Sequence, residues 1–257
     1  MRISANLGFL WTDLSLPDAI RAAGQAGFDA VECHFPYSVD PVEVKTALRD
    51  ANIPMLALNT DKADGMGLAA VPNRVSEARS LIDQAINYAT SVGADMVHVM
   101  AGFADGPGAG AIFIDNLLYA LDRVEGTDIT LLIEPLNAID APGYYLKNTE
   151  QAANIISAIG SNKLRLMFDC YHVQITEGNL THRLSELLPI IGHVQIASVP
   201  DRGEPDHGEV DYSDIVNHLA NIGYTGDIGV EYRPRTTTDS GLGWLPAIRA
   251  AARLSEE

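Results

Sequence analysis

Cysteine is scarce in this chain, with only Cys33 and Cys170 among 257 residues. Two cysteines cannot build the disulfide framework that holds small secreted domains together. We therefore expect two free thiols in the core of a protein of the reducing cytoplasm. The first residues, from Met1 to Asn6, contain no apolar segment of the kind found in secretory signal peptides, which agrees with that compartment.

Basic residues are also few, because 17 lysines and arginines stand against 34 aspartates and glutamates, for a formal net charge of −17. Such a surface repels the phosphate backbones of nucleic acids and anionic lipid. Long apolar runs are missing too. The longest, such as Thr130–Ile133, are as short as a β-strand, whereas a bilayer-crossing helix needs roughly 20 residues. The sequence therefore predicts neither a nucleic-acid partner nor a membrane association.

Hydrophobic residues make up 47% of the chain, and short β-rich runs alternate with longer amphipathic stretches. The expected strands are Arg2–Leu7, Ala30–Phe35, Pro54–Leu58, Met96–Ala101, Thr130–Glu134, Leu164–Asp169, His193–Ala197 and Ile228–Tyr232. The expected helices are Pro17–Ala26, Pro41–Ala51, Arg74–Val92, Ala111–Val124, Thr149–Ile159, Leu184–Leu188, Tyr212–Ile222 and Gly241–Arg253. Gly27, Gly93, Gly160 and Gly223 fall where helices should stop.

Eight β-then-α units fit into this length, and their strict alternation implies right-handed crossovers and a parallel sheet. The sequence therefore predicts the α/β class and a (β/α)₈ TIM barrel, formed as one domain by residues 1–257. A doubly wound open sheet is the alternative fold. No glycine-rich phosphate-binding sequence follows the first expected strand, which argues against that alternative.

Four successive expected strands end in a polar side chain that can bind a metal: Glu134, Asp169, Gln195 and Glu231. A lone acid after an apolar run is usually a solvated turn residue or a helix cap. In a (β/α)₈ barrel, however, the chemistry gathers at the C-terminal ends of the strands, and neighbouring strands lie about 4.8 Å apart. We therefore expect these four groups to share one mouth.

Three carboxylates at one mouth repel one another unless a cation or a proton compensates their charge. Two glutamates, one aspartate and one glutamine form an all-oxygen set, which suits Mg²⁺ or Mn²⁺ better than Zn²⁺. The sequence thus predicts a divalent metal ion held by this set. A metal-free site, in which one glutamate stays protonated and donates, is the alternative.

Further polar residues fall near the same mouth and are candidates for binding substrate. His172 lies just beyond Asp169, at the end of the second of these four strands, and His193 shares one face of an extended strand with Gln195. Arg202 lies on the next loop, where it would fork onto a carboxylate or pair with an acid of its own loop. His98 lies between two valines, so a buried core histidine is the alternative for it.

Eight segments taken together are specific, although none would suffice alone: Ser4–Leu7, Gly27–Glu32, Phe35–Tyr37, Ile133–Asn137, Phe168–His172, Gly192–Ala197, Asp201–Pro205 and Val230–Pro234. Through these segments essentially the whole chain resembles the hydroxypyruvate isomerase family, within the xylose-isomerase-like TIM barrel superfamily. The resemblance implies an aldose–ketose isomerase of glyoxylate and carbohydrate metabolism, which interconverts hydroxypyruvate and tartronate semialdehyde through an enediolate.

The resemblance also implies roles for individual residues. It makes Glu134 and Glu231 the catalytic acid/base pair, and it makes Glu134, Asp169, Gln195 and Glu231 the ligands of the divalent ion. The histidine and arginine positions with which the related ketose 3-epimerases contact substrate match His172 and Arg202.

Close relatives of the family leave the substrate open. The 2-oxo-tetronate isomerases share most of these motifs, and Val97–Gly102 and Asn179–His182 look like that subgroup, whereas Asp140–Gly143 looks like the hydroxypyruvate enzymes. Ketose 3-epimerases usually place a histidine where this chain has Gln195, which weakens that alternative.

Two alternative functions from other classes of protein stay open, and so does the oligomeric state. A barrel endonuclease for abasic DNA would need a richer histidine cluster for three zinc ions and a basic groove. A non-catalytic protein that binds sugar acids on the same barrel is not excluded by the fold. Exposed apolar helix faces could support a homo-oligomer.

Overall fold

The computed structural model describes residues 1–253, without the side chain of Arg253, and its eight parallel strands close into a barrel. Each strand pairs with the next along the chain, and the last pairs back onto the first. The strands are β1 (Ile3–Asn6), β2 (Ala30–Cys33), β3 (Met55–Asn59), β4 (Met96–His98), β5 (Thr130–Ile133), β6 (Leu164–Asp169), β7 (Ile191–Ile196) and β8 (Ile228–Val230). This closure confirms the predicted barrel and excludes the open sheet. The single-domain prediction runs to residue 257 and so extends past the described residues.

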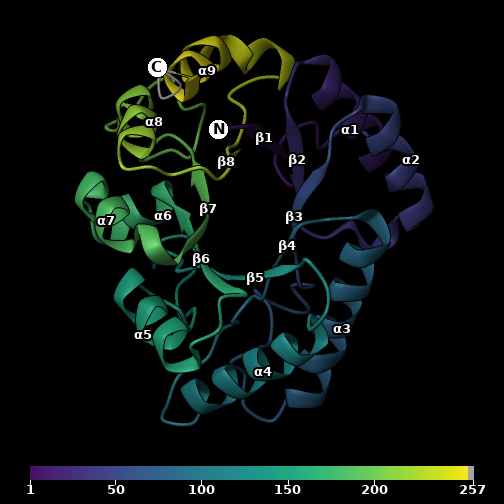
Figure 1. Ribbon diagram of the computed structural model, residues 1–257, viewed down its shortest axis with the longest axis vertical. Helices are drawn as coiled ribbons and strands as arrows, with labels where there is room; N and C mark the ends of the chain where they lie inside the picture. The colour runs from purple at the N-terminus through teal and green to yellow at the C-terminus, as the bar shows by residue number, and fades with distance from the viewer. Residues whose placement is uncertain (254–257) are drawn as a thin grey trace.

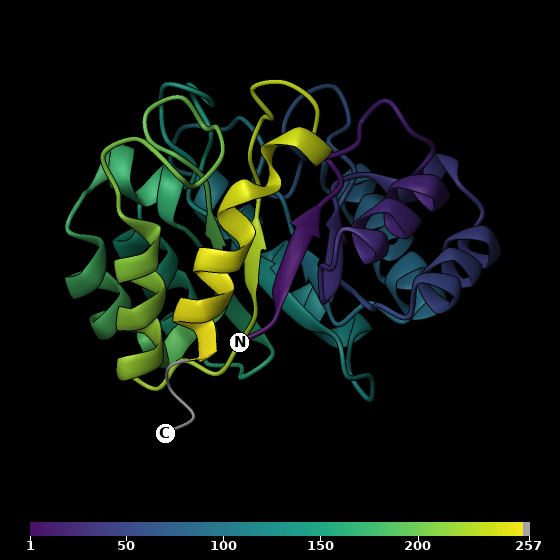
Figure 2. The same ribbon diagram turned by 90° about the horizontal axis from the view of Figure 1, so that it is seen from above.

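Helices surround the barrel and connect its strands (Figure 1). They are α1 (Leu16–Gln25), α2 (Pro41–Ala51), α3 (Val75–Val92), α4 (Ala109–Arg123), α5 (Thr149–Ile159), α6 (Cys170–Thr176), α7 (Leu180–Leu187), α8 (Tyr212–Asn221) and α9 (Leu245–Arg253). Within residues 1–253, the short 3-10 helices are η1 (Pro36–Ser38), η2 (Leu188–Ile190) and η3 (Asp239–Trp244). In Figure 2 the arrow of β1 points to the side on which long loops gather, which is the side of the C-terminal strand ends.

Local sequence signals explain where several helices begin and end. The Asp211 side chain accepts hydrogen bonds from the first backbone N–H groups of α8, as an N-cap does. The α5 helix has the predicted bounds, and its cap is the Asn148 side chain, which accepts from the backbone N–H of Gln151 at 2.8 Å. Gly93 and Gly160 end α3 and α5 at φ of 79° and 71°, in the left-handed region that favours glycine.

The structure shifts several of the predicted bounds, for example α7, which starts at Leu180 and not at Leu184, and it differs more clearly in two further helices. The short helix α6 was not expected, and it starts directly after Asp169, whose side chain caps it by accepting from the Tyr171 N–H. The expected helix Gly241–Arg253 is divided, because a 3-10 segment precedes α9.

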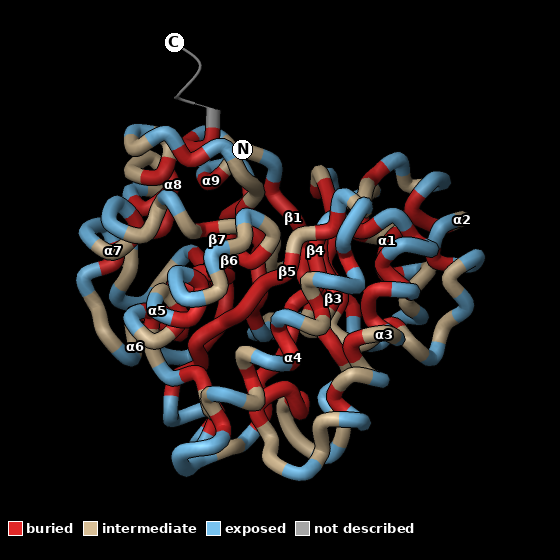
Figure 3. The backbone as a smooth tube through the Cα atoms, turned by 60° about the horizontal axis from the view of Figure 1, so that its bottom comes forward, coloured by how far each residue is buried: buried red, intermediate tan, exposed pale blue. Residues whose placement is uncertain are grey.

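Buried residues line the strands and the helix faces turned toward them, while exposed residues lie on the outside (Figure 3). Cys33 and Cys170 are both buried and free, as the sequence predicts. Within residues 1–253, no helix combines the length and the apolar character needed to cross a bilayer. The polar residues among the buried ones are concentrated inside the barrel at its C-terminal end, where the candidate site lies.

Candidate active site

The four predicted strand-end residues all lie at the C-terminal ends of neighbouring strands. Glu134 directly follows β5, Asp169 ends β6, Gln195 is the last but one residue of β7, and Glu231 directly follows β8. Their exposed fractions are between 1% and 8%. The structure therefore brings these side chains into one buried polar cluster, in which Arg202 and several residues from other strands also take part.

Glu231 is the most fully bonded carboxylate of this cluster. Its Oε1 accepts a hydrogen bond from Nη2 of Arg202 at 2.6 Å, and its Oε2 accepts from Asn6 at 2.9 Å and from Gln195 at 2.8 Å. Nε2 of His34 lies 3.5 Å from the same Oε2. Burial opposes ionisation, but the charges of His34 and Arg202 outweigh it and lower the pKa of Glu231 to about 2. Glu231 is therefore ionised at neutral pH and can act as a base.

Glu134 has the opposite environment. Its Oε1 is buried without a hydrogen-bond partner, and its Oε2 lies 3.5 Å from Nδ1 of His98. Burial and then the charges of Glu231 and Asp169 raise the pKa of Glu134 well above its usual range. The environments of the two glutamates therefore shift their pKa values in opposite directions.

Asp169 is held between a helix and the arginine. Its Oδ1 accepts from the Tyr171 N–H at 2.8 Å, and its Oδ2 lies 3.5 Å from Nη2 of Arg202. Burial raises the pKa of Asp169 to about 7, although Arg202 acts in the opposite direction. Cap and ion pair together fix the direction of this carboxylate.

His172 is oriented by the loop that follows β5. The backbone N–H of Asn137 donates to Nδ1 of His172 at 3.1 Å, and the side-chain amide of Asn137 lies 2.8 Å from the same atom. Since a backbone N–H can only donate, Nδ1 is an acceptor and the ring proton sits on Nε2. Burial, followed by the charge of Arg202, lowers the pKa of His172 to about 3. The neutral ring therefore offers an N–H donor, which fits the predicted contact with a substrate oxygen.

Arg202 turns into the mouth of the barrel instead of pairing within its own loop. Its guanidinium lies between the rings of Phe9 and Tyr171, 5.0 and 4.9 Å from their centroids. Of the acids in its loop, Asp201 pairs with His207 and Glu204 pairs with Arg235. The alternative that Arg202 only stabilises its loop is therefore wrong.

The two remaining candidate histidines lie deeper. His98 is 1% exposed beside Glu134, and burial lowers its pKa to about 4. His193 is completely buried, and its Nε2 lies 3.0 Å from Oε1 of Glu32, at ion-pair distance but not aligned as a hydrogen bond. His193 is thus directed at another side chain inside the barrel, and its predicted substrate contact stays untested.

The residues present fit a divalent cation. Buried oxygens of Glu134 and Gln195, both Oε1, have no hydrogen-bond partner, and such orphaned acceptors are costly unless something compensates them. Within the described residues, ligand atoms of Glu134, Asp169 and His172 lie within 4.8 Å of one another. His172 belongs to that group by distance only, because its Nε2 carries the proton. The remaining donors are oxygens, the set that Mg²⁺ and Mn²⁺ prefer.

Sequence reasoning missed several residues that complete the site: Asn6, Glu32, His34 and Asn137. Asn6 and Glu32 face each other in the register of β1 and β2, near the C-terminal ends of these strands. The rule that singled out four strand ends therefore also applied to the first two strands. Asn137 carried no such signal, because its contact with His172 depends on the path of a loop.

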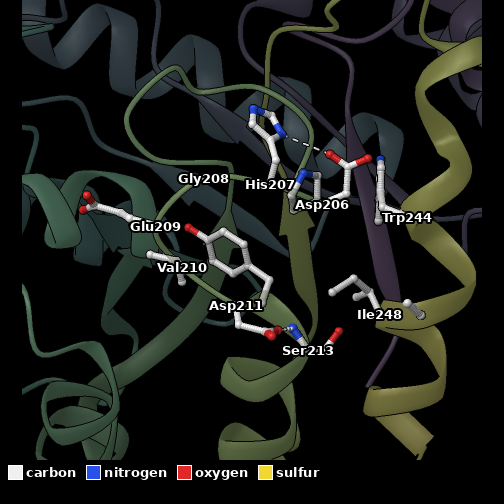
Figure 4. Close-up of a pocket in the computed structure, with 12 residues that line it drawn as sticks. Asp206, His207, Gly208, Glu209, Val210, Asp211, Ser213, Trp244 and Ile248 are labelled. Carbon is white, nitrogen blue, oxygen red and sulfur yellow. Dashed lines mark hydrogen bonds and ion pairs between the residues drawn. The ribbon is translucent and has the colours of Figure 1, made fainter.

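A separate cavity of about 490 Å³ lies outside this cluster, between the loop that follows β7 and helix α9 (Figure 4). Its walls include Asp206, His207 and Trp244, and none of the four strand-end residues lines it. His207 is paired with Asp206 and Asp201, so the charged groups at this cavity already have partners.

Comparison with known proteins places the chain in a family. The model of a family described as xylose isomerase-like TIM barrel matches residues 20–248. The chain belongs to this family. The predicted resemblance to the xylose-isomerase-like superfamily is therefore confirmed.

Relatives match nearly the whole chain. A Cupriavidus necator protein named 2-oxo-tetronate isomerase is 39% identical, over 95% of this chain and 97% of that protein. The hydroxypyruvate isomerase of Escherichia coli is 36% identical, over 97% and 100%. Among solved structures, a Brucella melitensis protein described as an AP endonuclease of family 2 is 35% identical, with a TM-score of 0.92 over 95% of this chain and 98% of that chain.

Proposed function

We propose that this protein is an aldose–ketose isomerase of short hydroxy-carbonyl acids, with hydroxypyruvate as its first candidate substrate. The observation that carries the proposal is the contrast between two buried strand-end glutamates. Glu231 accepts hydrogen bonds from Arg202, Asn6 and Gln195 and has a lowered pKa, whereas Oε1 of Glu134 has no partner and the pKa of Glu134 is raised. Pairs of carboxyl groups with separated pKa values are typical of acid/base catalysis. The isomerase names of relatives that match nearly the full length support the same conclusion.

Isomerisation of hydroxypyruvate to tartronate semialdehyde moves a carbonyl to the neighbouring carbon. Glu231 would remove a proton from the hydroxyl-bearing carbon, and the freed electron pair would form the double bond of an enediolate. Glu134 would return a proton to the former carbonyl carbon and take up the proton of the original hydroxyl, while Glu231 would pass the proton that it removed to the former carbonyl oxygen, so that both glutamates regain their starting states. His172 would donate its Nε2–H to a substrate oxygen on which negative charge develops. Atoms and electrons balance without any further reactant.

Arg202 gives the site its proposed preference for acids. Its guanidinium is buried, rigidly placed between two aromatic rings, and its Nε has no hydrogen-bond partner. An arginine fork binds a carboxylate through two parallel hydrogen bonds. We therefore assign the substrate carboxylate to Arg202, and this assignment separates hydroxy acids from neutral ketoses.

Glu134, Asp169, Gln195 and Glu231 would hold a divalent cation, for which Mg²⁺ or Mn²⁺ is the chemical preference. A bound cation would polarise the substrate carbonyl as a Lewis acid. The cation would supply only this polarisation, and the proton transfers would be carried out by the side chains of Glu134 and Glu231. Free buried thiols agree with a cytoplasmic location, and self-association stays a prediction.

The second candidate substrate is a 2-oxo-tetronate, because the relative from Cupriavidus necator carries that name. Parallel kinetics with hydroxypyruvate, 2-oxo-tetronates and free ketoses decide among them. We expect kcat/KM to be highest for one of the two acids and lowest for the ketoses. A preference for a free ketose would contradict the proposal. A duplex with an abasic site serves as a further substrate, and its cleavage would favour the endonuclease alternative, which the net charge of −17 opposes.

A further inference from the structure

A buried polar group lies inside the barrel next to the candidate site. It consists of Ser4, Glu32 and His193, which are at most 2% exposed, and it touches Gln195. Nε2 of Gln195 donates to Oε2 of Glu32 at 2.8 Å, while Ser4 Oγ donates to Oε1 of Glu32. The proposed reaction uses none of these three residues, so their arrangement needs another explanation.

The chemistry of Gln195 allows only one orientation of its amide. Its nitrogen lies 2.8 Å from Oε2 of Glu32 and 2.8 Å from Oε2 of Glu231. The nearby oxygens of Glu32 and Glu231 are hydrogen-bond acceptors, so an amide oxygen placed between them would be repelled on both sides. The nitrogen is therefore fixed toward the two glutamates, and the amide oxygen is left buried and without a partner.

Glu32 itself is held in place from several sides. Ser4 donates to it, His193 lies 3.0 Å away, and both contacts involve Oε1, so Oε2 is left for Gln195. Gly229 stands between Ser4 and Gln195 in the strand register, and an added Cβ there would overlap the Glu32 carboxylate. A glycine in the middle of a short strand thus provides the space that this carboxylate occupies.

We propose that Glu32 is a positioning residue, which orients the Gln195 amide so that its oxygen is free to bind the divalent cation. This inference rests on the metal site of the proposed function. Residues that hydrogen-bond to a metal ligand fix the direction of the ligand atom, and the proposal gives this role to Glu32. Glu32 acts through Gln195 and does not touch the substrate.

The test is a calorimetric titration of the metal-free protein with Mn²⁺ in the absence of substrate, which measures the affinity for Mn²⁺. Glu32→Gln should weaken Mn²⁺ binding about 10-fold or more, as is usual when an outer partner is lost. Glu32→Asp keeps the charge but retracts the carboxylate from Gln195, so it should weaken binding as well. Ser4→Ala serves as the matched control, because it removes a contact to Oε1 and leaves the hydrogen bond to Gln195.

Repeating the Glu32 substitutions in a Gln195→Met variant separates the proposed positioning role of Glu32 from a simple effect of its charge on metal binding. In Gln195→Met the amide is absent, so Glu32→Gln and Glu32→Asp should change the Mn²⁺ affinity less than about 3-fold, since coupled residues lose their effect when the partner is gone. An equal loss in both backgrounds would overturn the positioning role, and so would unchanged affinity in both Glu32 variants. Wild-type protein that binds no Mn²⁺ would also overturn it. Turnover of hydroxypyruvate by the wild type decides the proposed function separately.

Discussion

Arg202 donates a hydrogen bond from Nη2 to Oε1 of Glu231 at 2.6 Å. The guanidinium that we assign to the substrate carboxylate thus also touches the residue that we assign as the base. Burial alone would favour the protonated form of Glu231, but His34 and Arg202 lower its pKa to about 2. One arginine therefore joins recognition of an acid to the ionisation of the base.

Replacement of either glutamate should remove turnover while leaving the fold intact. Glu134→Gln and Glu231→Gln keep the size of the side chain but remove the exchangeable carboxyl proton. We expect kcat to fall 100-fold or more, because general acid/base groups typically contribute 10²-fold to 10⁴-fold. Steady-state kinetics give the rate and circular dichroism the fold. Retention of more than about a tenth of kcat in either variant would reject the paired roles.

Arg202→Lys should mainly raise KM for hydroxy acids. Lysine keeps the charge but loses the fork and the stacking between Phe9 and Tyr171. We expect KM to rise roughly 10-fold to 100-fold, because a hydrogen bond to a charged group contributes about 1.5–3 kcal/mol. Arg233→Lys is the matched control, since Arg233 also lies over Phe9 but is exposed. Equal effects of both substitutions on KM would contradict the assignment of the substrate carboxylate to Arg202.

Removal of divalent metal should inactivate the enzyme. Dialysis against EDTA, elemental analysis and assay before and after addition of Mg²⁺ or Mn²⁺ measure this directly. Three buried acids and an unpartnered amide oxygen explain the expected dependence. Full activity of protein with no bound metal would contradict this dependence, and Glu134 and Glu231 would then act as an acid/base pair without a metal.

Asp169→Asn should stabilise the metal-free protein at high pH. Burial raises the pKa of Asp169 from its ordinary 3.8 to about 7, so the folded state disfavours the ionised form. The resulting penalty is absent below pH 3.8, grows between pH 3.8 and 7, and is complete above pH 7. Asparagine does not ionise and can still cap α6.

The advantage of Asp169→Asn in unfolding free energy should therefore grow by about 4 kcal/mol between pH 4 and pH 8, at 1.36 kcal/mol per pKa unit. Urea denaturation in EDTA at several pH values measures it. A difference that stays constant with pH would show that Asp169 does not carry the raised pKa.

The alternation of strands and helices was sufficient to predict the barrel from the sequence. Helices α2 and α5 have the predicted bounds, because proline, a capping side chain and a left-handed glycine or asparagine define their ends locally. Helix α6 was missed because its cap, Asp169, is also the last residue of a strand. A side chain with two structural roles does not reveal the second one in a pattern of hydrophobicity.

The polar cluster was predicted only in part. Position at strand ends identified Glu134, Asp169, Gln195 and Glu231, and resemblance supplied their roles. The contact of Asn137 with His172 depends on three-dimensional proximity, since these residues are 35 positions apart. The packing of Glu32 against Gln195 joins residues 163 positions apart, and it requires the space left by Gly229. Such contacts exist only after the barrel closes.

The most direct measurement of the central claim is proton NMR of hydroxypyruvate incubated with the protein in D₂O. We expect conversion to tartronate semialdehyde with deuterium on the carbon that receives the returned proton, and loss of both conversion and exchange in Glu231→Gln. Neither conversion nor exchange with the wild type, in the presence of Mg²⁺ or Mn²⁺, would contradict it.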